Sequence, residues 1–155
     1  MLNQRASEAA GVVGIIDPDA YAPGNFDTGW IDASRFHRFL AAILVGDIAA
    51  TGTVDALIRI ASNGSGAGAE AATGKAITQM TQVGNDSNKQ ALIDVKPEDL
   101  KGATLSFKDG SATHFSLRVT LGTAGADMGA AVLGLGPRYA PASGHDLSSV
   151  DEIVA

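Results

Sequence analysis

The residues of this sequence that could do chemistry are few. Ser143, His145 and Asp146 supply the residue types of a hydrolase triad close together in the chain. A nucleophile, a base and an orienting acid rarely align when they are neighbours in sequence, because each side chain must point at the next. The sequence also lacks the nucleophile-elbow pattern in which a Ser sits between glycines. We therefore expect no enzymatic activity.

A cation site is the second chemical possibility. Asp17, Asp19 and Asp27, together with Asn25, offer the hard oxygen ligands that Ca²⁺ prefers. Their spacing does not match an EF-hand, and the prolines among them make turn formation the simpler interpretation. The sequence has no Cys and three scattered His, which leaves no set of zinc ligands. We expect no bound metal.

The glycine-rich motifs are incomplete as cofactor sites. Gly74 and Lys75 suggest a phosphate-binding loop, but Ala69 and Ala76 stand where that motif needs Gly and Ser or Thr. The small, polar run at 62–69 lacks the third Gly of a dinucleotide-binding fingerprint and is typical of an exposed loop. The sequence therefore predicts no cofactor.

The elements that must position these residues are short strands. The 19 glycines punctuate the chain at intervals typical of all-β domains. Apolar and polar residues alternate at 54–60 and most clearly at 114–121, which predicts strands with one buried face. Residues 104–107 also alternate and precede a turn signal at 109–110, so we expect a hairpin across 104–121.

Further strand candidates bring the expected number to about eight. Residues 36–45 fit a helical stripe as well, but the strand-rich context favours a strand there. A single helical turn is expected at 97–100. The fold class is therefore all-β, an antiparallel sandwich or jelly roll. The other candidates are 12–16, 76–82, 90–95 and 130–135.

The 155 residues predict one β domain with two terminal arms, about 1–11 and about 141–155. Apolar residues in the C-terminal arm recur at a spacing that could line one side of a helical turn, and such a stripe needs a partner. That partner is either a neighbouring molecule or the domain's own sheet edge. The candidate subunit or shell contacts are Trp30, Tyr139, Leu147, Val150, Ile153 and Val154.

Composition restricts the partners. The formal net charge is -6 and the sequence pI is about 4.8, which opposes binding to nucleic acid or to anionic lipid. The longest apolar run, at 39–45, is far shorter than the roughly 20 residues of a membrane-spanning helix. No export signal is visible near the start. We expect neither nucleic acid nor membrane as a partner.

Taken as a whole, the sequence resembles a group of small virion proteins of tailed bacteriophages. The resemblance covers roughly residues 27–155 and rests on a series of segments, none of which is a catalytic signature. Several of them lie beside glycines or close to the C-terminus. The segments are 30–36, 66–69, 74–79, 85–90, 115–120, 136–139 and 149–155.

The resemblance implies a structural role in the virion, as a decoration or cement protein on the capsid shell. The implied partners are the major capsid protein and copies of the chain itself, as a homo-oligomer on the particle. Synthesis is expected in the bacterial host cytoplasm. The alternatives are a head-to-tail connector or tail component, a surface carbohydrate-binding β module and a small hydrolase. Few aromatic residues are available for glycan binding, since the sequence has one Trp and two Tyr.

Overall fold

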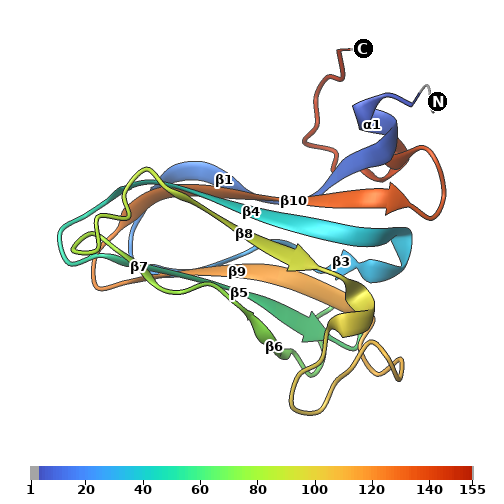
Figure 1. The fold of residues 1–155 in the computed structure, drawn as a ribbon, viewed down its shortest axis with the longest axis horizontal. Helices are drawn as coiled ribbons and strands as arrows, with labels where there is room; N and C mark the ends of the chain where they lie inside the picture. Colours follow the sequence, from blue (N-terminus) through green and yellow to red (C-terminus); the bar gives the residue numbers. More distant parts are fainter. Residues whose placement is uncertain (1–3, 155) are drawn as a thin grey trace.

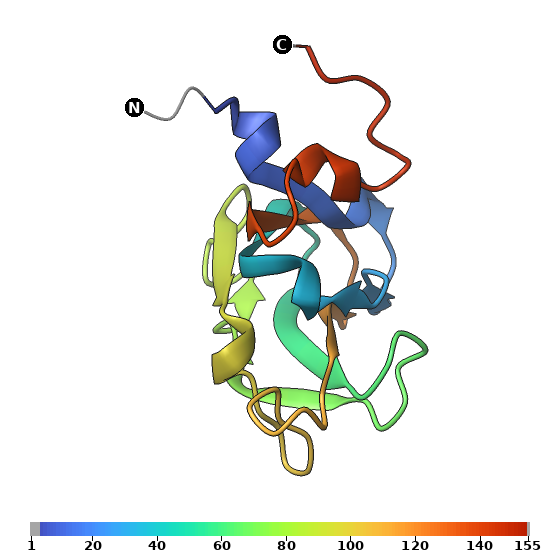
Figure 2. The ribbon, with the colours of Figure 1, turned by 90° about the vertical axis from the view of Figure 1, so that its right-hand side faces the viewer.

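A computed structural model describes residues 4–154 of the chain. Its main feature is a pair of antiparallel sheets packed face to face (Figures 1 and 2). The sheets enclose the core, and both terminal segments rise at one end of the upper sheet in Figure 1. The structure therefore confirms the predicted all-β sandwich.

The upper layer in Figure 1 is a four-stranded sheet, here called sheet A. Its two central strands, β10 and β4, form the longest strand pairing among the described residues, and β1 and β8 flank them. The strands, in spatial order, are β1 (Ala10–Tyr21), β10 (Ala126–Pro137), β4 (Phe36–Ile48) and β8 (Gln90–Val95).

The lower layer, sheet B, contains six strands. Two of them, β3 (Ile31–Asp32) and β7 (Met80–Thr81), have only two residues and pair with β9 and β5. The main strands, in spatial order, are β2 (Gly24–Asp27), β9 (His114–Gly122), β5 (Thr53–Ala61) and β6 (Glu70–Ala76).

The strand order is that of a jelly roll. The first strand pairs with the last, β2 with β9, β4 with β8, and β5 with β6, so that the chain forms nested pairs. Pairing of β10 with β4 and of β9 with β5 then joins these pairs into two sheets. Eight main strands in two such sheets are typical of jelly rolls.

Alternation along the strands builds the core, as the sequence predicts. Val54, Ala56, Ile58 and Ile60 of β5 are buried, whereas the residues between them face outward. Three phenylalanine rings fill the space between the sheets: Phe39 lies edge-on to Phe36 and to Phe115, with ring centroids 5.7 and 4.8 Å apart. Edge-to-face contacts of this kind add to the burial of the rings.

Helical structure is short. Over residues 4–154 it consists of one four-residue α-helix, α1 (Ala6–Ala9), and three 3₁₀ turns, η1 (Ala33–Arg35), η2 (Pro97–Asp99) and η3 (Ala142–His145). The turn expected at 97–100 is present as η2. Within the described part of the chain, no helix is long and apolar enough to cross a membrane.

The expected hairpin across 104–121 is wrong. Residues 104–107 form turns with a single bridge from Lys101 to Ser106, and β9 pairs with β5 and β2 instead. The carboxylate of Glu70 holds this loop, because it accepts hydrogen bonds from the backbone N–H groups of Thr104 (2.9 Å) and Leu105 (2.6 Å). The same hydrogen bonds lower the pKa of Glu70.

Strand boundaries differ elsewhere too. The candidate at 76–82 is divided: β6 ends at Ala76 and β7 begins at Met80. The N-terminal arm expected at about 1–11 contains α1 and the start of β1, which begins at Ala10. Residues 1–3 of that arm, and residue 155 of the other, lie outside the described residues.

The C-terminal arm lacks the helical turn suggested by its apolar spacing. Helical structure occurs earlier, at η3, where Ala142 is fully buried against the domain. Asp146 then accepts a hydrogen bond from the N–H of Val12 (2.6 Å), and the N–H of Leu147 donates to the carbonyl of Val12 (2.9 Å). The first half of the arm thus covers the free edge of β1, and residues 148–154 extend away from it.

Candidate interaction surfaces

The outer face of sheet A is apolar. Strand register places Ile15, Ala131, Ala42 and Leu92 in one row across the four strands. Leu92 at one end of this row is 64% exposed, and Ile15 at the other end is 37% exposed. Next to the row lies Leu44, which is 53% exposed. We call this surface the outer face of sheet A.

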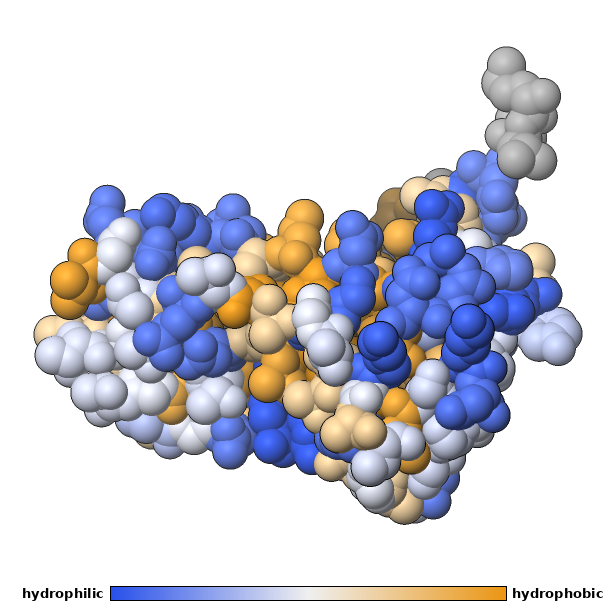
Figure 3. Space-filling model, turned by 60° about the horizontal axis from the view of Figure 1, so that its bottom comes forward, coloured by the Kyte–Doolittle hydropathy of each residue, from blue (hydrophilic) through white to orange (hydrophobic). Residues whose placement is uncertain are grey.

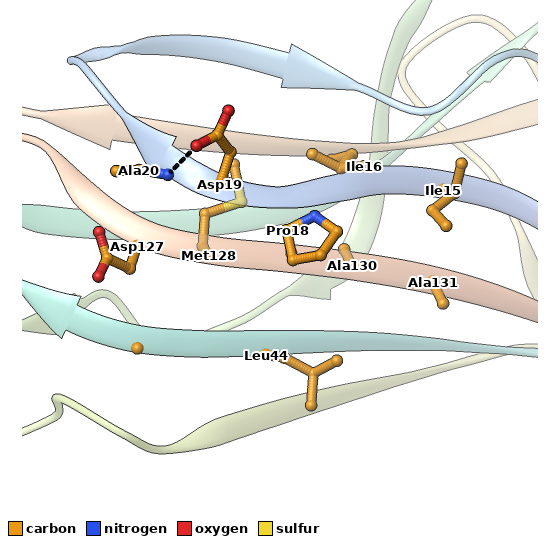
Figure 4. Close-up of a pocket in the computed structure, with 12 residues that line it drawn as sticks. Ile15, Ile16, Pro18, Asp19, Ala20, Leu44, Asp127, Met128, Ala130 and Ala131 are labelled. Atoms are coloured by element: carbon orange, nitrogen blue, oxygen red, sulfur yellow. Dashed lines mark hydrogen bonds between the residues drawn. The ribbon is translucent and has the colours of Figure 1, made fainter.

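A groove of about 510 Å³ runs along this face (Figure 4). Ala131 of β10 lies between Ile15 and Pro18 of β1 on one side and Leu44 of β4 on the other. Gly129 of β10 also lines the groove. Pro18 lies so close over β10 that a Cβ at position 129 would be only 3.0 Å from its Cα. Gly129 is therefore needed for the bulge of β1 to fold over β10.

The outer face of sheet B has the opposite character. Cross-strand polar pairs occupy it: Arg118 forms a two-pronged ion pair with Asp27, both contacts 2.7 Å, and the Thr120 hydroxyl donates to Asn25 Oδ1. The hydrogen bond to Asp27 raises the pKa of Arg118. Figure 3 brings this side forward: much of its lower part is hydrophilic or neutral, and hydrophobic residues gather in a band across the middle.

This difference between the faces points to a covered surface. An antiparallel sheet normally packs one face on the core and leaves polar residues on the other, as sheet B does. Contiguous apolar surface on a monomer marks an interaction site, because burial of each leucine-sized side chain contributes about 1.5–3 kcal/mol. The outer face of sheet A is therefore the candidate protein-binding surface.

Acidic side chains lie at one end of this face. Asp17, Asp19, Asp47 and Asp127 are exposed where β1, β4 and β10 enter the loops. None of the four forms an ion pair with another described residue. At the opposite end the exposed Arg38 is likewise unpaired among the described residues. Asp94 and Asp99 line one hollow with Arg38, so exposed acidic residues occur at both ends of the face.

Several residues singled out in the sequence meet at a second place. Trp30, His114, His145, Asp146 and Leu147 all line one hollow of about 340 Å³ between β1 and the start of β9. The triad types in it do not act on one another, since Asp146 binds the backbone of β1 and the His145 ring stacks edge-on against Phe36. No group of three potential metal ligands occurs among the described residues.

The other chemical candidates are dispersed. Asp27 and Asn25 pair with β9, as described above, away from Asp17 and Asp19 on β1. Lys75, the lysine of the incomplete phosphate motif, donates to the backbone carbonyl of Asp94 on the neighbouring sheet (2.8 Å). The side chains of Asn25, Asp27 and Lys75 therefore make contacts within the sandwich.

The six candidate contact residues differ in accessibility. The indole of Trp30 is covered by its own chain: the Arg59 guanidinium lies 5.8 Å from its centroid, and Gly66 packs against the ring. Leu147 and Val150 are half-buried. Tyr139 is 72% exposed, and Ile153 and Val154 are 46% and 87% exposed. The last three are thus available to a partner.

Sequence reasoning missed the residues of the apolar face. Ile15, Leu44 and Leu92 each lie in a segment correctly expected to be a strand. The available signal was the failure of alternation at 36–45 and 130–135, because a strand that is apolar at every position is apolar on both faces.

Comparisons with known proteins give little. The sequence matches no protein-family model and no curated protein. Among solved structures, the Gt strain of infectious bursal disease virus is similar over 86% of this chain at 13% identity, with a TM-score of 0.45. A structure of the Gx strain of the same virus is similar over 88% of this chain at 16% identity, with a TM-score of 0.42. The chain spans 33% and 36% of those chains. The assignment to the jelly rolls rests on the strand order alone.

Proposed function

We propose that this protein is a structural component of a tailed-phage virion that decorates and stabilises the capsid shell. The observation that carries the proposal is the apolar outer face of sheet A, since such a surface suits a subunit that is permanently assembled. The choice of a phage capsid as the assembly comes from the sequence resemblance to small virion proteins of tailed bacteriophages. Jelly rolls occur in viral capsid proteins, and also in lectins and cupins, so the fold agrees with this role by analogy only.

The C-terminal segment is the proposed contact with the shell. Residues 148–154 extend beyond the point where Leu147 is fixed to β1, and Ile153 and Val154 are exposed on them. Figures 1 and 2 show this segment standing clear of both sheets. An extended chain with apolar side chains can settle into a groove of the major capsid protein, the proposed partner.

A truncation tests the shell contact. A chain ending at Leu147 keeps η3 and the hydrogen bonds to Val12, whereas a chain ending at Tyr139 loses them. We expect the first variant to melt like the intact protein and to lose binding to particles that lack this protein. The second variant should melt at a lower temperature. Equal binding by the intact chain and by the variant ending at Leu147 would contradict the proposed contact.

Copy number separates decoration from the nearest alternative. A decorating protein occurs on the order of hundreds of times per particle, whereas a connector or tail ring contains about six or twelve copies. Quantitative mass analysis of purified particles measures this ratio against the major capsid protein. Six or twelve copies would assign the chain to the head-to-tail region and refute the decoration role.

A further inference from the structure

The loop between β5 and β6 contains an asparagine directly before a glycine. This pair, Asn63 and Gly64, is the one place in the sequence where glycine follows asparagine. Both residues are exposed, and the N–H of Gly64 donates no hydrogen bond among residues 4–154. Glycine has no side chain to shield its amide nitrogen, so this nitrogen can approach the preceding carboxamide closely.

The carboxamide of Asn63 is held over the peptide that follows it. Its Oδ1 accepts hydrogen bonds from the backbone N–H groups of Ser65 (3.0 Å) and Ala67 (3.2 Å). The bond from Ser65 closes an Asx turn, a ring that contains both the Asn63 Cγ and the nitrogen of Gly64. Two N–H donors on one carbonyl oxygen also stabilise negative charge that develops there. The carboxamide carbon is therefore both folded toward Gly64 and activated.

A histidine lies against the glycine. Nε2 of His114 is 3.2 Å from the position that a Cβ would take on Gly64. Nδ1 of the same ring is 2.8 Å from the Thr113 hydroxyl oxygen, and that hydroxyl donates its single proton to the carbonyl of Ser62 (2.7 Å). Nδ1 must therefore donate to Thr113, so the neutral ring carries its lone pair on Nε2, the atom beside Gly64.

We propose that Asn63 is a self-modification site, at which the Gly64 nitrogen attacks the carboxamide and His114 acts as the general base. Nε2 takes the proton of the Gly64 nitrogen as the bond from this nitrogen to the Asn63 Cγ forms. The oxygen that gains charge stays hydrogen-bonded to Ser65 and Ala67. The proton then passes from Nε2 to the Asn63 Nδ2, the Cγ–Nδ2 bond breaks, and ammonia leaves a cyclic imide.

Water completes the reaction. It opens the imide at either carbonyl, which leaves aspartate or isoaspartate at position 63, and the Gly64 nitrogen regains a proton. The net change exchanges ammonia for water, so no oxidant, metal or partner is needed. Because the chain carries all the reacting groups, the modified fraction grows with the time since folding.

The other described asparagines lack this combination. Asn25 lies in β2 and accepts a hydrogen bond from Thr120. Asn85 and Asn88 are exposed in a loop as Asn63 is, but residues with side chains, Asp86 and Lys89, follow them. We expect these three asparagines to keep their amides, and they serve as controls within the same molecule.

The modification should also change the surface around the loop. It adds a carboxylate to a chain whose formal net charge is already -6. The backbone carbonyl of Asn63 accepts from the N–H of Gly66 (3.1 Å), and Gly66 packs against the indole of Trp30. An isoaspartate lengthens the backbone at Asn63, so tryptophan fluorescence should shift as the product accumulates.

Peptide mass spectrometry measures the reaction in the purified full chain at neutral pH. Trypsin cuts after Arg59 and Lys75, so residues 60–75 form one fragment whose mass rises when the amide is lost. A synthetic peptide of the same residues lacks the fold and gives the reference rate. The folded chain should lose the Asn63 amide at least about 10-fold faster than this peptide. An equal or slower rate would overturn the proposal and leave Asn63 with the role of closing the loop.

A histidine variant tests the base. H114Q should slow the loss of the Asn63 amide at least about 10-fold, because it removes the proton acceptor beside Gly64. The matched control is H37Q, since His37 is exposed on β4 and lies outside this loop. It should keep the wild-type rate. Loss of the amide at the wild-type rate in H114Q would refute the assignment of His114 as the base.

A second pair of variants tests the tautomer and keeps the result decisive if H114Q lowers the melting temperature. T113V removes the hydroxyl that accepts from Nδ1 and should slow the reaction, whereas T113S keeps the hydroxyl and should react like the wild type. Equal rates in T113V and T113S would overturn the proposed path of the proton. All of these measurements use the chain without particles, so their outcome is independent of the proposed virion role.

Discussion

The ring of Phe36 should be energetically coupled to the glycine beside it. Phe36 is fully buried and contacts Phe39 and His145, so its ring has no free space to move into. A Cβ at Gly134 would approach three atoms of this ring to 2.5–2.6 Å. The backbone of Gly134 is not in the left-handed region, so Ala is otherwise acceptable there.

The magnitudes follow from these contacts. F36A should cost about 3–5 kcal/mol, the usual range for removal of a buried phenylalanine. G134A should cost about 1–3 kcal/mol in the wild-type protein, because the new methyl overpacks the core. In the F36A background the clash is gone, and Ala in a strand interior is favoured over Gly by about 0.5–1 kcal/mol. The two changes should therefore couple by about 1.5–4 kcal/mol.

Urea denaturation of the wild type, F36A, G134A and the double variant, all at one protein concentration, measures this coupling. The free energy of unfolding is compared at equal m values, so that changes in midpoint report stability. For a chain of this size F36A alone should also lower the melting temperature by about 6–20 °C. Additivity of the two single changes within about 0.5 kcal/mol would show that the ring and the glycine do not meet as described.

Three further predictions concern the loops and the arm. The hydrogen bonds from Leu105 and Thr104 lower the pKa of Glu70 below its usual value of 4.5, so the stability that they contribute is present above pH 4.5 and is lost as the pH falls further. E70Q should therefore lower the melting temperature at pH 7, and the difference in melting temperature from the wild type should become smaller in acid. D146A should reduce the free energy of unfolding by about 1–2 kcal/mol in urea, since the N–H of Val12 loses its acceptor, and D146N should cost less. G66A should quench or shift the tryptophan fluorescence and destabilise the chain, because φ is +80° at Gly66 and a Cβ would lie 2.5 Å from the indole of Trp30; an unchanged spectrum and midpoint would refute this packing.

Local patterns were sufficient for much of the fold. Alternation at 54–60 and 114–121 identified β5 and β9 and their buried residues, because period-two patterning reflects a sheet with one solvent-facing side. The hairpin at 104–121 failed for a physical reason. In a jelly roll the partners of β9 come from positions near 25 and 57, and pairing over such distances leaves no local signal.

The arm shows a related limit of sequence reasoning. The apolar spacing of Leu147, Val150, Ile153 and Val154 suggested one side of a helical turn. The chain instead makes a single turn at 147–150, closed by the hydrogen bond from the N–H of Val150 to the carbonyl of Leu147, and has no regular structure at 151–154. Two hydrogen bonds to Val12 at the open edge of β1 determine the path of the arm. The N–H of Val12 donates to the Asp146 carboxylate, and the N–H of Leu147 donates to the Val12 carbonyl. The unpaired N–H and C=O groups of an edge strand form hydrogen bonds with a segment that lies beside them. A short helix in the arm would gain little stability by comparison.

Two strand segments that are apolar on both faces form the candidate interface. Residues 36–45 fitted a helix as well as a strand, and residues 130–135 did not alternate at all, because the outward positions Leu40, Ala42, Leu44 and Ala131 are as apolar as the inward ones. An isolated domain gains nothing from such residues on its outer side. The apolar residues on both sides of these two central strands are thus the sequence feature on which the proposed assembly contact depends.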